Sequence, residues 1–156
     1  MKICDYLQAE FIFLNLPLPD KASVLHFVAD SCVSEGLAKN DNAIYTGLLH
    51  REGTMSTGVG SGIAFPHTTS SEVTDAAVFL IRLKDPIDFK SLDGLPVDIV
   101  LSLIIPENKT NLHLRLLARV SRLYREPDFI PAVKRADSSQ KLWKEIQTLE
   151  ERIAFP

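Results

Sequence analysis

The 156-residue chain lacks most of the features that would assign it to a specialised class of protein. It has only two cysteines, Cys4 and Cys32, without metal-ligand spacing, which fits a reducing compartment. No apolar run approaches the roughly 20 residues that cross a bilayer, and Asp5 and Glu10 interrupt the apolar N-terminal stretch, which makes it a poor signal peptide. The net charge of -3 provides no basic excess for nucleic acid. We therefore expect one cytoplasmic domain over residues 1–156, with neither membrane insertion nor nucleic-acid binding.

Common catalytic motifs are missing as well. The chain has no phosphate-binding loop ending in Gly-Lys-Ser/Thr, no HExxH, no CxxC and no GxSxG. The segment GVGSG lacks the third glycine of a dinucleotide-binding turn and does not lead into a helix. These absences argue against the corresponding nucleotide, zinc and serine chemistries.

Apolar periodicity predicts strands and helices that are interleaved without strict alternation. Strands are expected over residues 11–16, 62–66, 76–83 and 97–106, and helices over residues 21–36, 42–52, 110–126 and 139–153. Asp20 is expected to cap the first helix and Gly36 to end it, and residues 85–96 are expected to form a loop. The fold class is therefore predicted as α/β (mixed α+β), a three-layer α/β/α sandwich in which a mixed β-sheet is flanked by helices.

One segment, STGVGSGIAFPHTTSS (residues 56–71), carries no charged side chain although 24% of the chain is charged. It holds three glycines, seven hydroxyl residues and a Pro-His pair. Pro66 stiffens the backbone before His67, and the glycines let other parts of the chain approach closely. A loop histidine is more often incidental than catalytic, but this rigid frame favours a functional role for His67.

The other three histidines lie in predicted helices. His26 and His50 are interpreted as packing or helix-boundary residues. His113 falls in the first turn of the helix over residues 110–126, and two interpretations of it stay open. It is either a core histidine bonded to backbone, or part of a site with His67 at a helix N-terminus, where anions are favoured.

Two groups of charged residues flank these histidines. Arg51 and Glu52 lie at the end of the second predicted helix, just before the glycine turn, where such a pair is usually solvated. Arg51 in that place can also swing over the turn and stabilise an anion. The helix over residues 110–126 has one basic face, which the simplest interpretation exposes to solvent. Its arginines follow one another at spacings of four, three and three residues: Arg115, Arg119, Arg122 and Arg125.

Two segments resemble one known family. LLHREGTMSTGVGSGIAFPH (residues 48–67) is similar to the active-site segment of the mannitol/fructose-type IIA domains of the bacterial sugar phosphotransferase system, whose final histidine is phosphorylated. NLHLRLLARVSRL (residues 111–123) resembles that family's second signature, whose histidine lies beside the first. The resemblance extends to residues 96–106 and to the N-terminal elements, so it covers nearly the whole chain.

The resemblance implies a role for each candidate residue. His67 is the phosphoryl acceptor, His113 orients the phosphoryl group or His67, and Arg51 balances the incoming charge. Three glycines are expected to point backbone N–H groups at the phosphoryl oxygens: Gly58, Gly60 and Gly62. The implied donor is an HPr-like phosphocarrier protein that itself carries a phosphohistidine, so neither a metal nor another cofactor is needed.

Some residues depart from the family pattern. Thr54 and Met55 replace a usual Leu-Gly, Phe65 stands where Ile is frequent, and Thr68 stands where Ala or Gly is common. Ser61 replaces a frequent Asn. These departures bear on partner choice more than on the reaction.

The family contains transport and regulatory members. The chain stops at Pro156 with neither a IIB-like cysteine motif nor a membrane segment, and residues 85–106 look like the free-standing nitrogen-regulatory type, which acts on regulatory proteins. We therefore expect the nitrogen type. The alternatives are a fructose- or mannitol-specific transport component that passes its phosphoryl group to a IIB domain, a non-catalytic interaction module on the same fold, and, more distantly, a zinc hydrolase, for which a third ligand is not recognisable.

Overall fold

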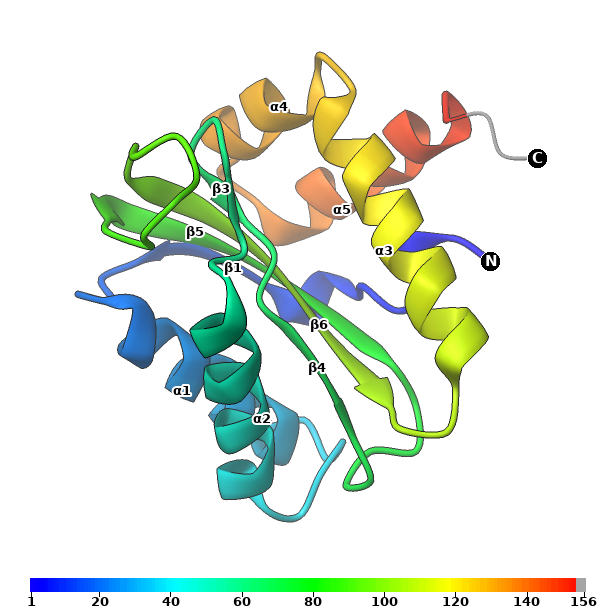
Figure 1. Cartoon of the computed structure of the whole chain (residues 1–156). Helices are drawn as coiled ribbons and strands as arrows, with labels where there is room; N and C mark the ends of the chain where they lie inside the picture. Colours follow the sequence, from blue (N-terminus) through cyan, green and yellow to red (C-terminus); the bar gives the residue numbers. More distant parts are fainter. Residues whose placement is uncertain (154–156) are drawn as a thin grey trace.

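The structure, a computed structural model, describes residues 1–153 and has the three-layer architecture expected from the sequence (Figure 1). Two helices, α1 (Lys21–Ser34) and α2 (Asp41–Thr54), cover one face of the sheet. Three others cover the opposite face: α3 (Thr110–Arg125), α4 (Phe129–Arg135) and α5 (Ser139–Glu151). Two short 3-10 helices, η1 (Ile3–Asp5) and η2 (Ala9–Phe11), precede the first strand.

The sheet is mixed, with the strand order β1-β5-β6-β3-β2 and with β4 also paired to β6. Its strands are β1 (Ile12–Leu16), β2 (Gly58–Gly60), β3 (Ile63–Ala64), β4 (His67–Ser70), β5 (Ala77–Ile87) and β6 (Val97–Pro106). β1 runs parallel to β5, β5 antiparallel to β6, and both β3 and β4 parallel to β6. β3 and β4 therefore lie along one edge of β6, separated by Phe65 and Pro66.

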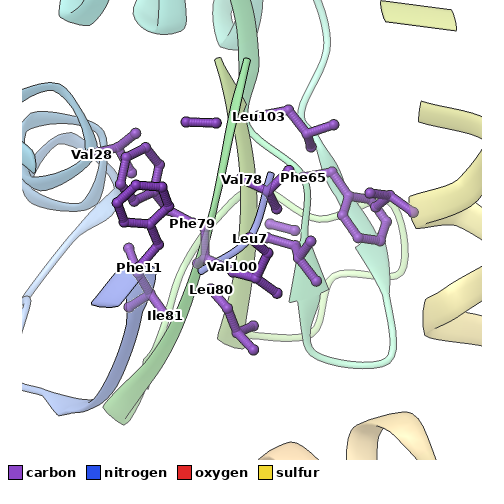
Figure 2. Packing of buried hydrophobic residues seen from close by; sticks show 14 of the residues in the cluster. Leu7, Phe11, Val28, Phe65, Val78, Phe79, Leu80, Ile81, Val100 and Leu103 are labelled. Atoms are coloured by element: carbon purple, nitrogen blue, oxygen red, sulfur yellow. The ribbon is translucent and has the colours of Figure 1, made fainter. Parts of the chain in front are cut away.

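The core surrounds the two central strands. β6 is buried along nearly its whole length, because helices cover both faces of the sheet and leave no solvated side for an alternating pattern. Figure 2 shows Phe79 of β5 beside Phe11 and Val28 on one side of the sheet, and Val78 beside Leu7 on the other. The rings of Phe11 and Phe79 are 4.9 Å apart between centroids.

Two of the helices begin at side chains that cap them. The Asp20 carboxylate accepts a hydrogen bond from the Ser23 backbone N–H at 2.8 Å and begins α1, as predicted. Ser138 caps α5 through the Lys141 backbone N–H. Within residues 1–153, no helix is both long enough and apolar enough to span a bilayer.

Some predicted boundaries were wrong. Residues 85–87 belong to β5 and not to a loop, because the strand continues past Pro86 through an irregularity between Arg82 and Ile87, where a proline is tolerated. The short helix α4 was missed because seven residues with Pro131 in the first turn show too little periodicity. β2 and β4 were missed because glycines and hydroxyl residues are weak strand signals.

Candidate functional site

His67 begins strand β4 and is paired with Leu103 of β6, so it lies on a strand and not in the turn expected from the sequence. The Pro66 carbonyl just before it accepts hydrogen bonds from the Leu103 backbone N–H and the Ser102 hydroxyl. The His67 Nδ1 atom lies 2.8 Å from the Phe65 carbonyl oxygen. Because a carbonyl only accepts, Nδ1 carries the proton, and Nε2 keeps the lone pair of a nucleophile.

His113, in the first turn of α3, lies beside His67, with 5.7 Å between the ring centroids. Its Nε2 atom is buried and has no hydrogen-bond partner within the described part of the chain. The structure therefore brings together two histidines that are 46 positions apart in the sequence. Among the residues that the structure describes, one imidazole nitrogen of His113 is left without a hydrogen bond, as expected of a group that serves a ligand.

Two hollows adjoin His67, and Arg51 lines both of them. The first, here called the histidine hollow, has a volume of about 660 Å³ and is lined by His50, Thr54, His67, Thr68, Thr69 and His113. The second, here called the apolar hollow, has a volume of about 320 Å³ and is lined by Met55, Val59, Phe65, Leu92, Leu117 and Tyr124. His67 thus stands between a space that histidine, threonine and arginine side chains line and a space that mainly apolar side chains line.

Arg51 and Arg82 are the arginines nearest to His67 in the sequence, and the structure places them differently. Arg51 lies in the last turn of α2, and its Nη1 donates to the Met55 carbonyl at 2.8 Å. Arg82 instead donates to the carbonyls of Val133 and Ala136 near the end of α4. Of these two arginines, Arg51 is the one that lines the hollows beside His67.

Glu52 is buried, whereas the sequence suggested a solvated helix end. Its carboxylate accepts from the Thr57 backbone N–H at 2.8 Å and from the Thr57 hydroxyl at 2.7 Å, and it pairs with the Lys21 ammonium at 3.1 Å. These bonds tie the end of α2 to the segment that leads to His67. They also occupy both oxygens of Glu52.

Three glycines are predicted to bind a phosphoryl group through their backbone N–H groups: Gly58, Gly60 and Gly62. Among the described residues, they line neither hollow. A Cβ atom at Gly58 would lie 2.4 Å from the Ser91 hydroxyl, one at Gly60 would lie 3.0 Å from the Asp93 carboxylate, and one at Gly62 would lie 3.1 Å from the Asp98 carboxylate. Their observed role is to let residues of 91–98 approach closely, and phosphoryl binding by their N–H groups stays a prediction.

A fourth glycine, which the sequence did not single out, packs directly against the site. Gly47 lies inside α2, and a Cβ atom there would be 2.5 Å from the Thr68 hydroxyl, next to His67. The absence of a side chain at position 47 lets α2 pack closely on β4. Thr68 is one of the departures from the family pattern, and Gly47 makes room for it.

Replacing Gly47 by alanine should destabilise the protein, although alanine in a helix interior is normally better than glycine by about 1 kcal/mol. We expect the free energy of unfolding to fall by about 1–3 kcal/mol in total, because the new side chain would clash with Thr68. In a Thr68→Ala background that contact disappears, and Gly47→Ala should become stabilising. Urea unfolding of the four proteins in this double-mutant cycle measures the coupling, and an equal effect of Gly47→Ala in both backgrounds would contradict the packing described.

Both histidines of the site have lowered pKa values. Burial is the main cause for His67, and the nearby Arg51 guanidinium and His113 lower its pKa further, while the bond to the Phe65 carbonyl and the Glu52 carboxylate act in the opposite direction. Burial also lowers the pKa of His113. His67 is therefore neutral near pH 7, which is the state in which Nε2 is nucleophilic.

This lowered pKa predicts a pH dependence with a definite sign. The unfolded chain binds a proton at His67 near pH 6.5, the ordinary histidine value, whereas the folded chain binds it only at lower pH. The free energy of unfolding should therefore fall as pH drops below about 6.5. A proton NMR titration should give His67 and His113 midpoints below that of the same protein unfolded in urea, and midpoints at or above the unfolded value would contradict the burial described.

The remaining sequence interpretations are partly corrected. His26 is exposed and stacks on Tyr45 at 3.7 Å, in agreement with a packing role. His50 is exposed at the rim of the histidine hollow. The arginine face of α3 is not simply solvated, because Arg119 pairs with the buried Glu150 at 3.3 Å, and Arg125 lines the apolar hollow.

Comparisons with known proteins agree with this geometry. The family described as "Phosphoenolpyruvate-dependent sugar phosphotransferase system, EIIA 2" matches residues 5–148. A nitrogen regulatory protein of Bradyrhizobium diazoefficiens is 34% identical over 92% of this chain and 93% of its own length. A fructose-specific EIIABC component of Bacillus subtilis is 32% identical over 91% of this chain and 22% of its own, longer chain.

A solved structure supports the same assignment at the level of the fold and the sequence. The nitrogen regulatory protein IIA-Ntr of Neisseria meningitidis superimposes with a TM-score of 0.84 and 25% identity, over 92% of this chain and 98% of that one. The match takes in both histidine-bearing segments, because the family covers them without interruption from residue 5 to residue 148. The chain therefore belongs to the EIIA 2 family of the phosphoenolpyruvate-dependent sugar phosphotransferase system.

Proposed function

We propose that this phosphotransferase-system protein carries a phosphoryl group on the Nε2 atom of His67, received from the phosphohistidine of an HPr-like phosphocarrier protein. The observation that carries the proposal is the hydrogen bond from His67 Nδ1 to the Phe65 carbonyl, which leaves the Nε2 lone pair available beside Arg51 and His113. The histidine hollow then holds the phosphoryl oxygens.

The transfer is an in-line displacement at phosphorus. The Nε2 lone pair of His67 forms a new N–P bond while the N–P bond of the donor breaks and returns its electron pair to the donor imidazole. The proton on Nδ1 stays on the bond to Phe65. Because such a transition state is loose, the protein acts chiefly by positioning groups and by stabilising charge on the phosphoryl oxygens. The hydrogen-bond donors to these oxygens are the Arg51 guanidinium and His113 in its Nε2–H tautomer.

The downstream role that we propose is regulatory, of the nitrogen type. The support is the similarity to nitrogen regulatory proteins over nearly their full length, at 34% identity in one case and at a TM-score of 0.84 in another. A sugar-transport role, with transfer to a IIB domain, is the second candidate, because the fructose-specific relative is 32% identical.

Donor preference tests this choice. The protein is mixed with equal amounts of two phosphorylated carriers, one from a nitrogen-type system and one from a sugar-type system, and initial rates of labelling are compared. We expect kcat/KM to be at least about tenfold higher with the nitrogen-type carrier, a difference of about 1.4 kcal/mol in transition-state free energy. A preference for the sugar-type carrier would favour the transport role, and no labelling by either would refute the phosphoryl-carrier function.

Replacing Arg51 by alanine should slow transfer by about 100-fold, the usual loss when one preorganised charge-stabilising donor is removed. A phosphoryl group brings roughly -1.5 to -2 charges at pH 7. Residues 56–71 contain no charged side chain of their own that could balance this charge. Arg51→Lys should recover only part of the rate, because an ammonium lacks the planar fork that holds two oxygens. Rapid-quench kinetics give the rates, and the lifetime of phosphorylated His67 should shorten in parallel.

Arg82→Ala provides the matched control. Its guanidinium donates to the Val133 and Ala136 carbonyls and to the Asn15 side chain, so its loss should lower stability and leave the transfer rate within about twofold of wild type. If Arg82→Ala is slow while Arg51→Ala matches the wild type, the charge that balances the phosphoryl group has been assigned to the wrong arginine.

A further inference from the structure

A chain of hydrogen bonds runs from the His67 ring back to the end of α2. The His67 Nδ1–H donates to the Phe65 carbonyl at 2.8 Å, and the Phe65 backbone N–H donates to the Thr57 carbonyl at 3.0 Å. The Thr57 backbone N–H and hydroxyl both donate to the Glu52 carboxylate, at 2.8 and 2.7 Å. Phe65, whose carbonyl fixes the tautomer of His67, is therefore itself held, through Thr57, by a buried carboxylate.

Lys21, the first residue of α1, lies at the far end of this chain. Its ammonium pairs with the Glu52 carboxylate at 3.1 Å and lies 4.7 Å from the centroid of the Phe89 ring. The Glu52 side chain is only 3% exposed and the Lys21 side chain 21%. Water therefore screens this pair poorly, and a carboxylate left there without its cation would be an uncompensated buried charge.

The charge of Glu52 acts on His67 across the chain of hydrogen bonds. Burial is the main influence on the pKa of His67 and lowers it, whereas the Glu52 carboxylate acts to raise it. A carboxylate whose field reaches His67 also repels an incoming phosphoryl group, which brings roughly -1.5 to -2 charges at pH 7. The Lys21 ammonium offsets this charge and leaves both carboxylate oxygens in their bonds to Thr57.

We propose that Glu52 and Lys21 are positioning residues for phosphoryl transfer at His67. Glu52 holds Thr57 and Phe65 in the arrangement that keeps the proton on Nδ1 and the lone pair on Nε2. Lys21 cancels the charge that this carboxylate would otherwise place near the incoming phosphoryl group. The inference rests on the proposed function and adds to it a residue of α1, outside both histidine-bearing segments.

Removing the Glu52 carboxylate should lower kcat and leave KM nearly unchanged. In Glu52→Ala both bonds to Thr57 are lost, and we expect kcat with the phosphorylated carrier to fall by about 10–100-fold, the range known for groups that orient metal-ligating histidines. KM should stay within about twofold of wild type, because the buried Glu52 presents no surface to the carrier. Glu52→Gln keeps an oxygen for the Thr57 N–H and should recover most of the rate.

NMR of the His67 ring separates this role from a loss of packing. Nitrogen-15 spectra should show the Nδ1–H tautomer in the wild type and a mixture of tautomers in Glu52→Ala. The titration midpoint of His67 should fall in Glu52→Gln, which removes a negative charge, and rise in Lys21→Met, which removes a positive one. A looser, better-hydrated site would raise it in both variants. Arg51 and His113, which also act on the pKa of His67, are unchanged in them.

A double-mutant cycle tests the balance of charge. Lys21→Met leaves the Glu52 carboxylate without its cation and should slow transfer by about tenfold, within the usual range for groups in contact. The double variant Lys21→Met, Glu52→Gln buries no charge at this place, so it should be faster than Lys21→Met and within about threefold of wild type. A double variant slower than either single variant would contradict the proposed balance.

Glu150→Gln is the matched control, because Glu150 is also a buried carboxylate that accepts two backbone N–H groups. Its bonds go to Ile3 and Cys4 in η1, and among the described residues it lines neither hollow. This variant should unfold at a lower urea concentration and keep kcat within about twofold of wild type. A kcat as low as that of Glu52→Ala would show that any buried carboxylate has this effect, and would overturn the proposal.

Phosphoramidate, a small donor, keeps the two proposals apart. Glu52→Ala should be labelled slowly by phosphoramidate as well as by the carrier, because the defect lies in the His67 ring. Thr57→Val, which loses only the hydroxyl bond to Glu52, gives the same comparison if Glu52→Ala does not fold. Wild-type kcat and an intact Nδ1–H tautomer in these variants would overturn the positioning role and leave transfer at His67 in place. A wild-type protein that neither donor labels would overturn the phosphoryl-carrier function and the positioning role with it.

Discussion

The His67→Ala variant should accept no phosphoryl group from a phosphorylated carrier, whereas the wild type is labelled to completion. Within the histidine hollow, His67 is the histidine whose Nδ1 is fixed to a backbone carbonyl, and its Nε2 is thereby left nucleophilic. Its lowered pKa keeps it neutral at pH 7. The measurement is the acid-labile phosphate bound per protein, mapped by mass spectrometry.

His50→Ala supplies the control for this experiment. His50 also lines the histidine hollow but is exposed, and its removal should leave labelling complete. If the His67→Ala variant is fully labelled, another side chain is the acceptor and the proposed reaction at His67 is wrong.

The His113→Ala variant should accept its phosphoryl group on His67 but at a rate lower by about 10–1000-fold, the range for losing one positioned charge-stabilising donor. His113 Nε2 is buried, has no partner within residues 1–153 and lies on the ring next to His67. We propose that its N–H donates to a phosphoryl oxygen, which would give this atom the partner that it lacks. Rapid-quench kinetics with the phosphorylated carrier measure the rate.

A conservative variant separates a positioning role from packing. His113→Gln keeps an N–H donor on a side chain of similar length and should recover part of the rate lost in His113→Ala. Recovery of stability without recovery of rate is expected for a packing residue. A His113→Ala variant that transfers at the wild-type rate shows that His113 plays no part in the reaction.

The long periodic elements of the fold were predictable, and the short ones were not. β6 is a long apolar run in which only Asp98 and Ser102 are polar, and α1 and α5 begin at side chains that cap them, so local sequence decides these elements. β2 and β4 have few apolar residues and exist because they pair with neighbours on the sheet. Their presence depends on tertiary contacts that composition does not encode.

The pairing of His67 with His113 could be predicted only from the resemblance to a family. Sequence spacing does not bring together residues on β4 and α3. The structure explains the meeting, because β4 pairs with β6, and α3 follows β6 after a short turn and folds back over the sheet. The first turn of α3 therefore places His113 beside His67.

The surroundings of the site could not be deduced from the sequence. Glu52 seemed to be a solvated helix end, but Thr57 and Lys21 pair with it in the interior. Gly47 was not singled out in the sequence, yet α2 approaches β4 closely there. Both roles depend on what lies across a tertiary contact, and the only local signal was a glycine in the middle of a helix.

The most direct test of the central claim is the identity of the phosphorylated nitrogen. The protein, labelled with nitrogen-15 in its histidine side chains, is phosphorylated by the carrier, and long-range proton–nitrogen NMR spectra assign the atom bonded to phosphorus. The predicted result is Nε2 of His67, with Nδ1 still bonded to the Phe65 carbonyl. A phosphoryl group on Nδ1 of His67, or on any other histidine, would contradict it.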